Sequence, residues 1–359
     1  MNKIKITVSI ILIAILCVSA AGCGGGSTGA ADSANGADAG DSQAQTASGV
    51  SRMLSAACVV APDTVGGQGL GKFAELVNEM GKGEIGVDAY YNGTLGTNAE
   101  MMEQLIMGTL DFAHVSAANL SVYSDACLIF DVPFEWVTAE AAVEGFTGEL
   151  GDRVLNEITE EVDGLVAIGW TTQGFRHITA GKEIRSPKDL AGMKIRMMDN
   201  KLHTECFAAM GASPTTMAYS EVYTGLQQGT IDMQENPLSN IYTARFHEVN
   251  KYTMLDGHVY DPVIILCSRA TYDSLTPEQQ TMLWDAAHMT GEWIHEQVVD
   301  IDQEYIGKIT ADGAFVIDMS VEEKLAFQEM CRPVYDSWAA RIGKDKMDMV
   351  NAINAKYLN

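Results

Sequence analysis

The chain of 359 residues is 47% hydrophobic and carries 23 lysines and arginines against 48 aspartates and glutamates, a formal net charge of −25. A surface this acidic repels nucleic acid and anionic lipid, which excludes both as partners. An anionic ligand would therefore need a local basic pocket whose attraction outweighs the repulsion from the protein's overall negative charge.

Residues 1–22 are predicted to be a lipoprotein signal peptide. Two lysines give a basic start, and the apolar run at 6–20 is too short for a membrane span. Small residues precede Cys23, which resembles a bacterial lipobox, although Ala20 stands where leucine is usual. We expect a lipid on Cys23 that anchors the protein to the cell membrane, facing the periplasm or the outside. A plain secreted protein is the alternative.

Residues 23–52 are predicted to be a flexible tether, because most of them are small or polar and cannot build a core. The remaining chain is long enough for two domains. Its cysteines are odd in number and widely spaced, which favours neither a disulfide framework nor a metal site. We expect them to be buried small apolar residues. They are Cys58, Cys127, Cys206, Cys267 and Cys331.

A first α/β unit is predicted from the alternation of strand and helix patterns. Its segments are the strands 56–62, 86–91 and 110–115 and the helices 69–80 and 98–108. This order predicts a parallel, doubly wound sheet, and Asn98 is the predicted N-cap of the second helix. Ligands bind such sheets at the carboxyl ends of the strands, so Ser116 and Asn119 fall where a site should lie.

A second α/β unit with the same rhythm follows a helical region. Its predicted segments are the helical residues 138–162, the strands 164–170 and 193–197, the helices 202–210 and 220–228, and the segment 234–237. Ser220 is the predicted N-cap of the last helix. Arg176 falls just after the first of these strands, Arg196 lies within the second, and Asn236 lies within 234–237.

A long helix is predicted after Thr276, which begins a capping box with Gln279. Apolar residues recur every three or four positions from Leu283 to Tyr305, which indicates about thirty helical residues and roughly 45 Å. A helix of that length exceeds one domain and is expected to brace two. A last helical region is predicted from Ser320, interrupted at Pro333.

Arg176, Arg196 and Asn236 form the core of a candidate binding site. A guanidinium group matches a planar carboxylate with two parallel hydrogen bonds, which lysine cannot do. Two arginines and an amide that converge on one cleft would bind a small carboxylate. The chain has no nucleophile elbow, phosphate loop, dinucleotide fingerprint or zinc motif, so we expect no cofactor and no metal. His258 is expected to be a core or helix-end histidine.

The segment 174–262 contains motifs whose order and spacing together are specific. They read GFRHIT, SPKDLAGMKIR, MGASPTTM, SEVYTGLQQG, QENPLSNI and KYTMLDGHVY. In this arrangement the chain resembles the solute receptors of tripartite ATP-independent periplasmic (TRAP) transporters, of the dicarboxylate-receptor-like type. A weaker resemblance extends over about residues 56–340.

The resemblance implies an α/β fold of two hinged lobes, like type II periplasmic binding proteins, with the long helix bracing both. It implies lobe I at 53–173 plus 262–301 and lobe II at 174–261 plus 302–359. Arg196 would pair with the ligand carboxylate, Arg176 would support it, and Asn236 would fix the same group. Other residues that would line the cleft are Tyr219, Gln173, Ser116 and Asn119.

Two departures from the family pattern concern the part of the pocket that would bind the ligand away from its carboxylate. Met233 stands where glycine is frequent, and Met197-Met198 replaces a frequent Val-Pro. Both changes leave the residues that would bind the ligand carboxylate in place. The family's residues that would bind the rest of the ligand cannot be carried over to this chain. Asp199, Asn200 and Asn119 suggest groups that bind hydroxyls, which favours a hydroxy- or sugar acid over a plain dicarboxylate.

The implied function is that of a monomeric, lipid-anchored receptor rather than an enzyme. It would deliver an organic acid to the small and large TRAP membrane subunits for ion-coupled uptake. A receptor of an ABC importer is the alternative with the same two-lobe architecture. An extracytoplasmic enzyme that processes carboxylates is a further alternative, with Glu235 or Asp199 as its general base.

Overall fold

The computed structural model describes residues 50–358. The predicted signal peptide 1–22, the lipidation site Cys23 and the tether up to residue 49 lie outside the described residues. The first strand begins at Arg52, which is the last residue of the predicted tether. No helix within the described residues is both long and apolar enough to cross a membrane.

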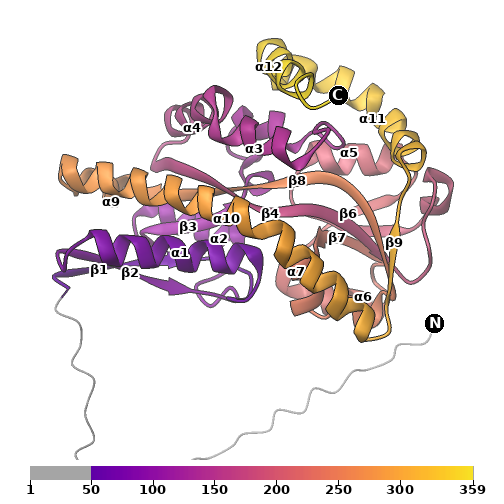
Figure 1. Ribbon diagram of the computed structural model, residues 1–359, viewed down its shortest axis with the longest axis horizontal. Coiled ribbons are helices and arrows are strands. Elements are labelled where there is room, and N and C mark those ends of the chain that lie inside the picture. The colour runs from indigo at the N-terminus through magenta and orange to yellow at the C-terminus, as the bar shows by residue number, and fades with distance from the viewer. Residues whose placement is uncertain (1–49, 359) are drawn as a thin grey trace, which may run out of the picture. The chain divides into compact units, whose positions relative to one another are not determined.

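One mixed sheet of nine strands organises the described residues (Figure 1). Its order is β2-β1-β3-β8-β4-β7-β5-β6, and β9 pairs with β8. The strands are β1 Arg52–Ala57, β2 Ile85–Tyr90, β3 Phe112–Ser116, β4 Leu165–Ala180, β5 Lys194–Met197, β6 Ser213–Thr216, β7 Met233–Pro237, β8 Tyr252–Ser268 and β9 Phe315–Asp318.

Both predicted α/β units are confirmed. β1 pairs in parallel with β2 and β3, and β5 pairs in parallel with β6 and β7. We call these two groups the first and second parallel units. Between them, β4 and β8 run antiparallel to each other and pair outward with β7 and β3. The two units are therefore joined by two continuous strands rather than by loops.

The long strands differ from the sequence prediction. The predicted strand 164–170 is wrong at its end, because β4 continues through Arg176 to Ala180. Register shifts interrupt the β4–β8 pairing after Ala167, Thr172 and Arg176, so side chains do not alternate evenly along the strand. The 17-residue β8 was not predicted, because buried polar residues break its apolar pattern.

The first strand also lies earlier than expected. The prediction placed it at 56–62, whereas β1 covers Arg52–Ala57 and aligns residue by residue with β2. Its first two residues are exposed and its polar Ser55 is half-buried, which hid the strand in the sequence. The apolar residues that follow β1 leave the sheet, and Val59 lines the cleft described below.

Helices fill the connections between the strands. The longer ones are α1 Val65–Met80, α2 Asn98–Met107, α3 Ala139–Thr147, α4 Glu149–Glu161, α5 Lys201–Ala209, α6 Val222–Gln228, α10 Pro277–Ala311, α11 Val321–Ile342 and α12 Lys344–Asn354. Shorter ones are α7 Leu238–Thr243, α8 Phe246–Val249 and α9 Arg269–Asp273, and the 3-10 turns are η1 Ala117–Leu120, η2 Ala126–Asp131, η3 Pro187–Leu190 and η4 Tyr219–Glu221.

Three helix boundaries correct the prediction. Thr97, not Asn98, caps α2, because its hydroxyl accepts from the Glu100 N–H while the Glu100 carboxylate returns to the cap. Ser220 lies inside η4, and α6 begins after it at Val222. Pro333 does not interrupt α11, which continues to Ile342.

The long helix α10 is confirmed, with Thr276 as its N-cap and a length of 35 residues. It packs on α1 and β4 and also on α7 and β9, so it spans both parallel units (Figure 1). The close approach of α10 to β4 depends on a glycine in each of these elements. A Cβ at Gly174, where φ is +82°, would lie 2.9 Å from an Asp302 carboxylate oxygen, and one at Gly291 would lie 2.4 Å from the Trp170 carbonyl.

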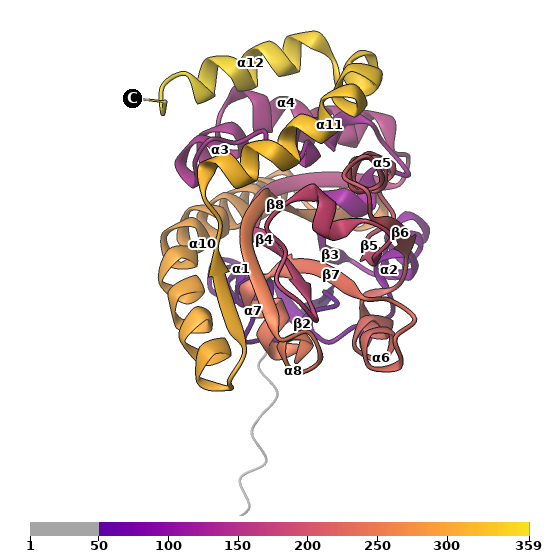
Figure 2. The same cartoon turned by 90° about the vertical axis from the view of Figure 1, so that its right-hand side faces the viewer.

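The C-terminal helices cover another part of the sheet. α11 packs on α5 and η2, and α12 packs on α3 and α11 (Figure 2). Their contacts reach residues early in the chain, because the Tyr335 hydroxyl donates to the Pro133 carbonyl and Lys346 pairs with Glu157. Apolar side chains of α11 and α12, among them Phe327, Trp338 and Val350, are buried in the largest core cluster.

Candidate functional site

A cleft of about 640 Å³ opens between the two parallel units. One wall comes from residues 92–100, between β2 and α2, and the other from residues 196–199 and 216–221 of the second unit. A smaller pocket of about 40 Å³ continues from its inner end. All seven residues predicted from the sequence line this inner pocket, namely Ser116, Asn119, Gln173, Arg176, Arg196, Tyr219 and Asn236.

The strand ends explain this convergence. Ser116 is the last residue of β3, Arg196 lies one residue before the end of β5, and Asn236 lies one residue before the end of β7. Parallel strands present their carboxyl ends on one edge, so each unit contributes to the same pocket. Gln173 and Arg176 enter from β4, which passes between the units.

Arg196 is the available cation of the site. Its side chain is 3% exposed, and its Nε donates to the Met217 carbonyl at 2.9 Å. Among the described residues no acceptor lies within hydrogen-bond distance of its two terminal nitrogens. Burial lowers the pKa of Arg196 to about 10, although the charge of Glu235 opposes this. The group is therefore charged at neutral pH and presents a free fork to the cleft.

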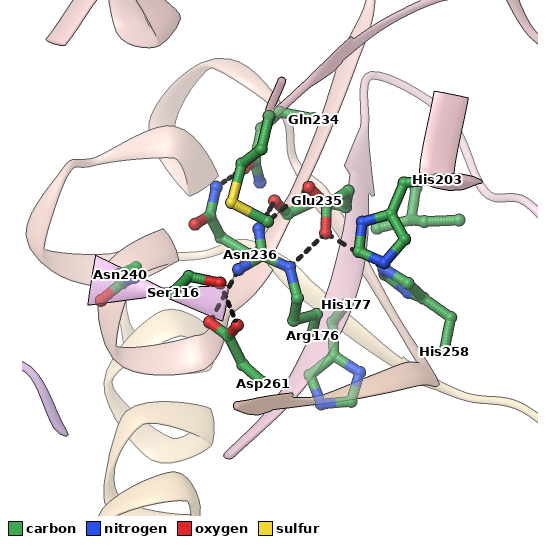
Figure 3. A network of polar contacts seen from close by, with 12 residues as sticks. Ser116, Arg176, His177, His203, Gln234, Glu235, Asn236, Asn240, His258 and Asp261 are labelled. Carbon is green, nitrogen blue, oxygen red and sulfur yellow. Dashed lines mark hydrogen bonds and ion pairs between the residues drawn. The ribbon is translucent and has the colours of Figure 1, made fainter. Parts of the chain in front are cut away.

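Arg176 is occupied by protein carboxylates (Figure 3). Its Nε and Nη2 bind both carboxylate oxygens of Glu235, Nη2 also binds the Glu235 carbonyl, and Nη1 binds Asp261 at 2.8 Å. These bonds use four of the five N–H donors of a guanidinium group. Burial would lower the pKa of Arg176, but the Glu235 and Asp261 charges outweigh burial and raise it. Arg176 can thus support a ligand with at most one further N–H.

Asp261 joins three of the predicted residues, and the sequence analysis missed it. Its carboxylate accepts from the Ser116 hydroxyl at 2.7 Å and from Arg176 (Figure 3). It also accepts from the Gln173 amide at 3.1 Å. The side chain is almost fully buried, and burial raises the pKa of Asp261. Its position in β8 carried no sequence signal, because its partners lie 85 or more residues away.

A chain of buried charges extends behind Arg176. The His258 ring contacts Glu235 at 3.0 Å through Nε2 and Asp256 at 2.7 Å through Nδ1. Burial would lower the pKa of His258, but the two carboxylates outweigh it and raise the pKa to about 9. The expectation that His258 is a core histidine is confirmed, since it is 1% exposed. Arg176 and His258 are thus held by three buried carboxylates, those of Glu235, Asp256 and Asp261.

The protein should become less stable at alkaline pH as His258 loses its proton. Its folded pKa of about 9 exceeds the ordinary value of 6.5. This contribution to the free energy of unfolding is therefore complete below about pH 6.5 and disappears as the pH rises through about 9. Denaturant unfolding from pH 6 to 10 should show a smaller loss for His258→Gln than for wild type. His288→Gln, at an exposed site on α10, should keep the wild-type profile. Equal pH profiles for wild type and His258→Gln would contradict the charged pairing.

Three other predicted residues keep polar groups toward the pocket. Asn236 donates one amide N–H to Gln234, which leaves its second N–H free (Figure 3). The Asn119 amide makes only long contacts, at 3.4 Å to the Ser116 carbonyl and 3.7 Å to the Met198 sulfur. Tyr219 is half-buried, and its ring packs edge-on against Phe246. These groups can donate to a ligand without breaking a strong internal bond.

The outer part of the cleft is acidic. Its lining includes the exposed carboxylates of Glu100, Asp199 and Glu221 beside the polar Asn92, Asn98, Thr216 and Ser220. Among the described residues, Arg196 is the one lysine or arginine that lines the outer cleft. No three His, Cys, Asp or Glu side chains within residues 50–358 are placed to hold a metal ion.

Comparison with known protein families gives one match over most of the chain. Residues 56–341 match the DctP model, described as bacterial extracellular solute-binding protein, family 7. A solute-binding protein of Verminephrobacter eiseniae is 32% identical over 287 residues, which cover 80% of this chain and 84% of that protein. A C4-dicarboxylate-binding periplasmic protein of Rhodobacter capsulatus is 29% identical over 300 residues, or 83% of this chain and 90% of that one.

Comparison with solved structures gives the same fold. A TRAP periplasmic solute-binding protein from a Polaromonas species, bound to D-erythronate, superposes with a TM-score of 0.80 at 29% identity. The match covers 84% of this chain and 98% of that one. The sheet, the crossing strands and the cleft therefore belong to a two-lobe receptor architecture.

Proposed function

Because this chain belongs to family 7 of the bacterial extracellular solute-binding proteins, the DctP family of TRAP receptors, we propose that it binds one small organic acid and delivers it to a membrane transporter. The partners would be the small and large TRAP membrane subunits, with uptake coupled to an ion gradient. The proposed lobes are residues 53–173 plus 262–301 and residues 174–261 plus 302–359. A monomer, as proposed, would present each lobe to one transporter.

The observation that carries the ligand class is the free guanidinium of Arg196 at the inner end of the cleft. The residue is 3% exposed and its terminal nitrogens make no hydrogen bond within the described part of the chain, and a buried charge without a partner is costly. A ligand carboxylate would supply both the missing charge and two parallel acceptors. The second N–H of Asn236 and the remaining N–H of Arg176 lie around the same pocket and can bind the same carboxylate.

The charge balance favours a monocarboxylate with hydroxyl groups. Arg176 is bound by Glu235 and Asp261 and His258 by Glu235 and Asp256, whereas Arg196 makes no ion pair with a carboxylate among the described residues. A second ligand carboxylate would point toward the acidic outer cleft, where like charges repel it. Hydroxyl groups would instead find carboxylate and amide partners there. A hydroxy acid such as the D-erythronate bound by the Polaromonas relative fits this arrangement.

Mass spectrometry of ligand released from the natively purified protein tests the proposal first. A thermal-shift panel should then compare four-carbon hydroxy acids, sugar acids and succinate, each with its neutral amide. We expect hydroxy monocarboxylates to raise the melting temperature most and amides to have no effect. If succinate stabilises the protein more than every hydroxy acid, the proposed tail specificity is wrong. If no carboxylate stabilises the protein, the proposed anchor is wrong.

The same samples distinguish a receptor from an enzyme. A receptor should return its ligand chemically unchanged after prolonged incubation, whereas an enzyme would convert it. Glu235, the sequence-based candidate for a general base, is committed to Arg176 and His258. These contacts lower the pKa of Glu235, although burial acts in the opposite direction, so it is a poor proton acceptor. Turnover of any cleft-binding acid would contradict the proposed role.

Membrane attachment through Cys23 is part of the proposal, although that residue lies outside the described part of the chain. Small residues before Cys23 and the polar segment after it support lipidation. Cys23→Ser should move the protein from the membrane fraction to the soluble extracytoplasmic fraction, as measured by immunoblotting. The matched control is Cys58→Ser, at a buried site of the folded domain, which should stay membrane-bound. Retention of Cys23→Ser in the membrane fraction would contradict lipid anchoring at this residue.

A further inference from the structure

Two cysteines that lie far apart in sequence meet in the fold. Cys206 lies near the end of α5 and Cys331 lies in the middle of α11, 125 residues later. The Cys331 sulfur lies 4.0 Å from the Cys206 carbonyl oxygen, and both side chains are fully buried. Figures 1 and 2 both show α5 beneath α11, and the two helices are in contact.

The other thiols have only local backbone partners. Cys58 approaches the Val60 carbonyl, Cys127 the Ala117 carbonyl and Cys267 the Ser268 carbonyl. Within residues 50–358, Cys206 and Cys331 are thus the one pair of cysteines in contact. The Cys331 sulfur is thus in contact with the backbone of Cys206, and a disulfide joins cysteines whose Cα atoms are about 4.4–6.8 Å apart.

The two thiols also influence each other's ionisation. A side-chain hydrogen bond from Cys206 lowers the pKa of Cys331, against the effect of burial. The reciprocal bond, together with burial, raises the pKa of Cys206. Cys331 is therefore the thiol that ionises first, and a thiolate is the form that attacks a disulfide.

We propose that Cys206 and Cys331 are a redox pair that forms a disulfide between α5 and α11. The oxidant is a protein or small-molecule disulfide outside the cytoplasm, where such oxidants are found. The Cys331 thiolate attacks that disulfide and displaces one oxidant thiolate, forming a mixed disulfide. Cys206 then loses its proton, attacks the Cys331 sulfur and displaces the second oxidant thiolate. The receptor loses two electrons and two protons, and the oxidant becomes a dithiol.

The bond would fix parts of the protein that surround the cleft. α5 begins directly after Asp199 and Met198, which line the cleft. α11 is tied to the segment before α3, because Arg341 pairs with Asp125 and Tyr335 donates to the Pro133 carbonyl. A disulfide would therefore link α5, which follows the cleft-lining residues, to the helix that is tied to Asp125 and Pro133. We expect it to raise thermal stability, because it closes a long loop.

Refolding in a redox buffer tests the pair, because both thiols are accessible to the oxidant before they become buried in the folded protein. The full chain carries Cys17→Ser and Cys23→Ser, is unfolded and reduced, and is refolded in reduced and oxidised glutathione. Free thiols are then alkylated under denaturing conditions, and peptides are mapped by mass spectrometry. We expect a Cys206–Cys331 linkage, with a total mass before alkylation that is lower by two hydrogen atoms than that of the reduced chain. The linked form should melt roughly 5–10 °C above the reduced form.

Matched variants separate this pair from random oxidation. Cys206→Ala and Cys331→Ala should each abolish the linkage and the melting shift while their reduced forms still fold. Cys267→Ala removes a buried thiol that has no cysteine neighbour, and it should keep both effects. The proposal is wrong if all five thiols are alkylated after refolding. It is equally wrong if linkages are distributed among other pairs, or if the linked form melts no higher than the reduced form.

Discussion

Arg196→Lys should weaken binding of the organic acid severely, and Arg196→Ala should weaken it further. The guanidinium group is 3% exposed, and only its Nε is used by the protein. Loss of one partner of a buried charge pair costs about 2–5 kcal/mol, which corresponds to roughly a thirty-fold to several-thousand-fold weaker Kd. Lysine keeps the charge but loses the planar fork, so it does not restore the paired contact. Isothermal calorimetry with the identified ligand measures both variants.

Two arginines serve as controls for this experiment. Arg269→Lys changes a half-buried arginine that binds the Thr159 and Leu165 carbonyls away from the cleft, so it should leave the affinity unchanged. Arg176→Lys should reduce affinity less than Arg196→Lys, because Arg176 has little capacity left for the ligand. If Arg196→Lys binds as tightly as wild type, Arg196 does not anchor the carboxylate.

Glu235→Gln should destabilise the folded protein by about 3–5 kcal/mol, because it leaves two buried cations without their shared partner. Glu235 is fully buried and binds both Arg176 and His258, which are themselves buried. Glutamine keeps the shape and one acceptor oxygen but removes the negative charge. Guanidinium unfolding followed by circular dichroism should show a lower midpoint with an unchanged slope.

An exposed ion pair provides the comparison. Glu329→Gln removes the partner of Arg332 on the surface of α11, where solvent screens the charges. This variant should unfold at nearly the wild-type denaturant concentration. If Glu235→Gln also unfolds there, the contacts of Glu235 with Arg176 and His258 do not stabilise the folded protein.

Local patterns predicted the elements that depend on neighbouring residues. The capping box at Thr276, the start of the last helix at Ser320 and the apolar stripe of α10 were predicted correctly, because caps and helix faces involve residues three or four apart. The parallel units were also predicted, since each alternates short strands with helices. The motifs around Arg176 and Arg196 also placed both arginines at the same pocket.

Interactions between distant segments could not be predicted in this way. β8 contains Asp256, His258 and Asp261 at positions that face a buried network, so its sequence does not look like a long strand. Asp261 binds Ser116, Gln173 and Arg176 only because β3, β4 and β8 are neighbours in the sheet. The pairing of Cys206 with Cys331 likewise depends on the docking of α11, which no local spacing encodes.

The central place of β8 in the sheet has a consequence for how the chain is made. β8 lies between β3 and β4, so the edges of both strands stay unpaired until residues 252–268 have been synthesised. α1 likewise lacks its cover until α10 follows. The N-terminal half therefore cannot complete its hydrophobic core while the ribosome is still translating the rest, and its contacts have high sequence separation, which slows folding. We expect such a chain to stay unfolded long enough for export, and we expect neither parallel unit to fold on its own, because each pairs with β8 or β4.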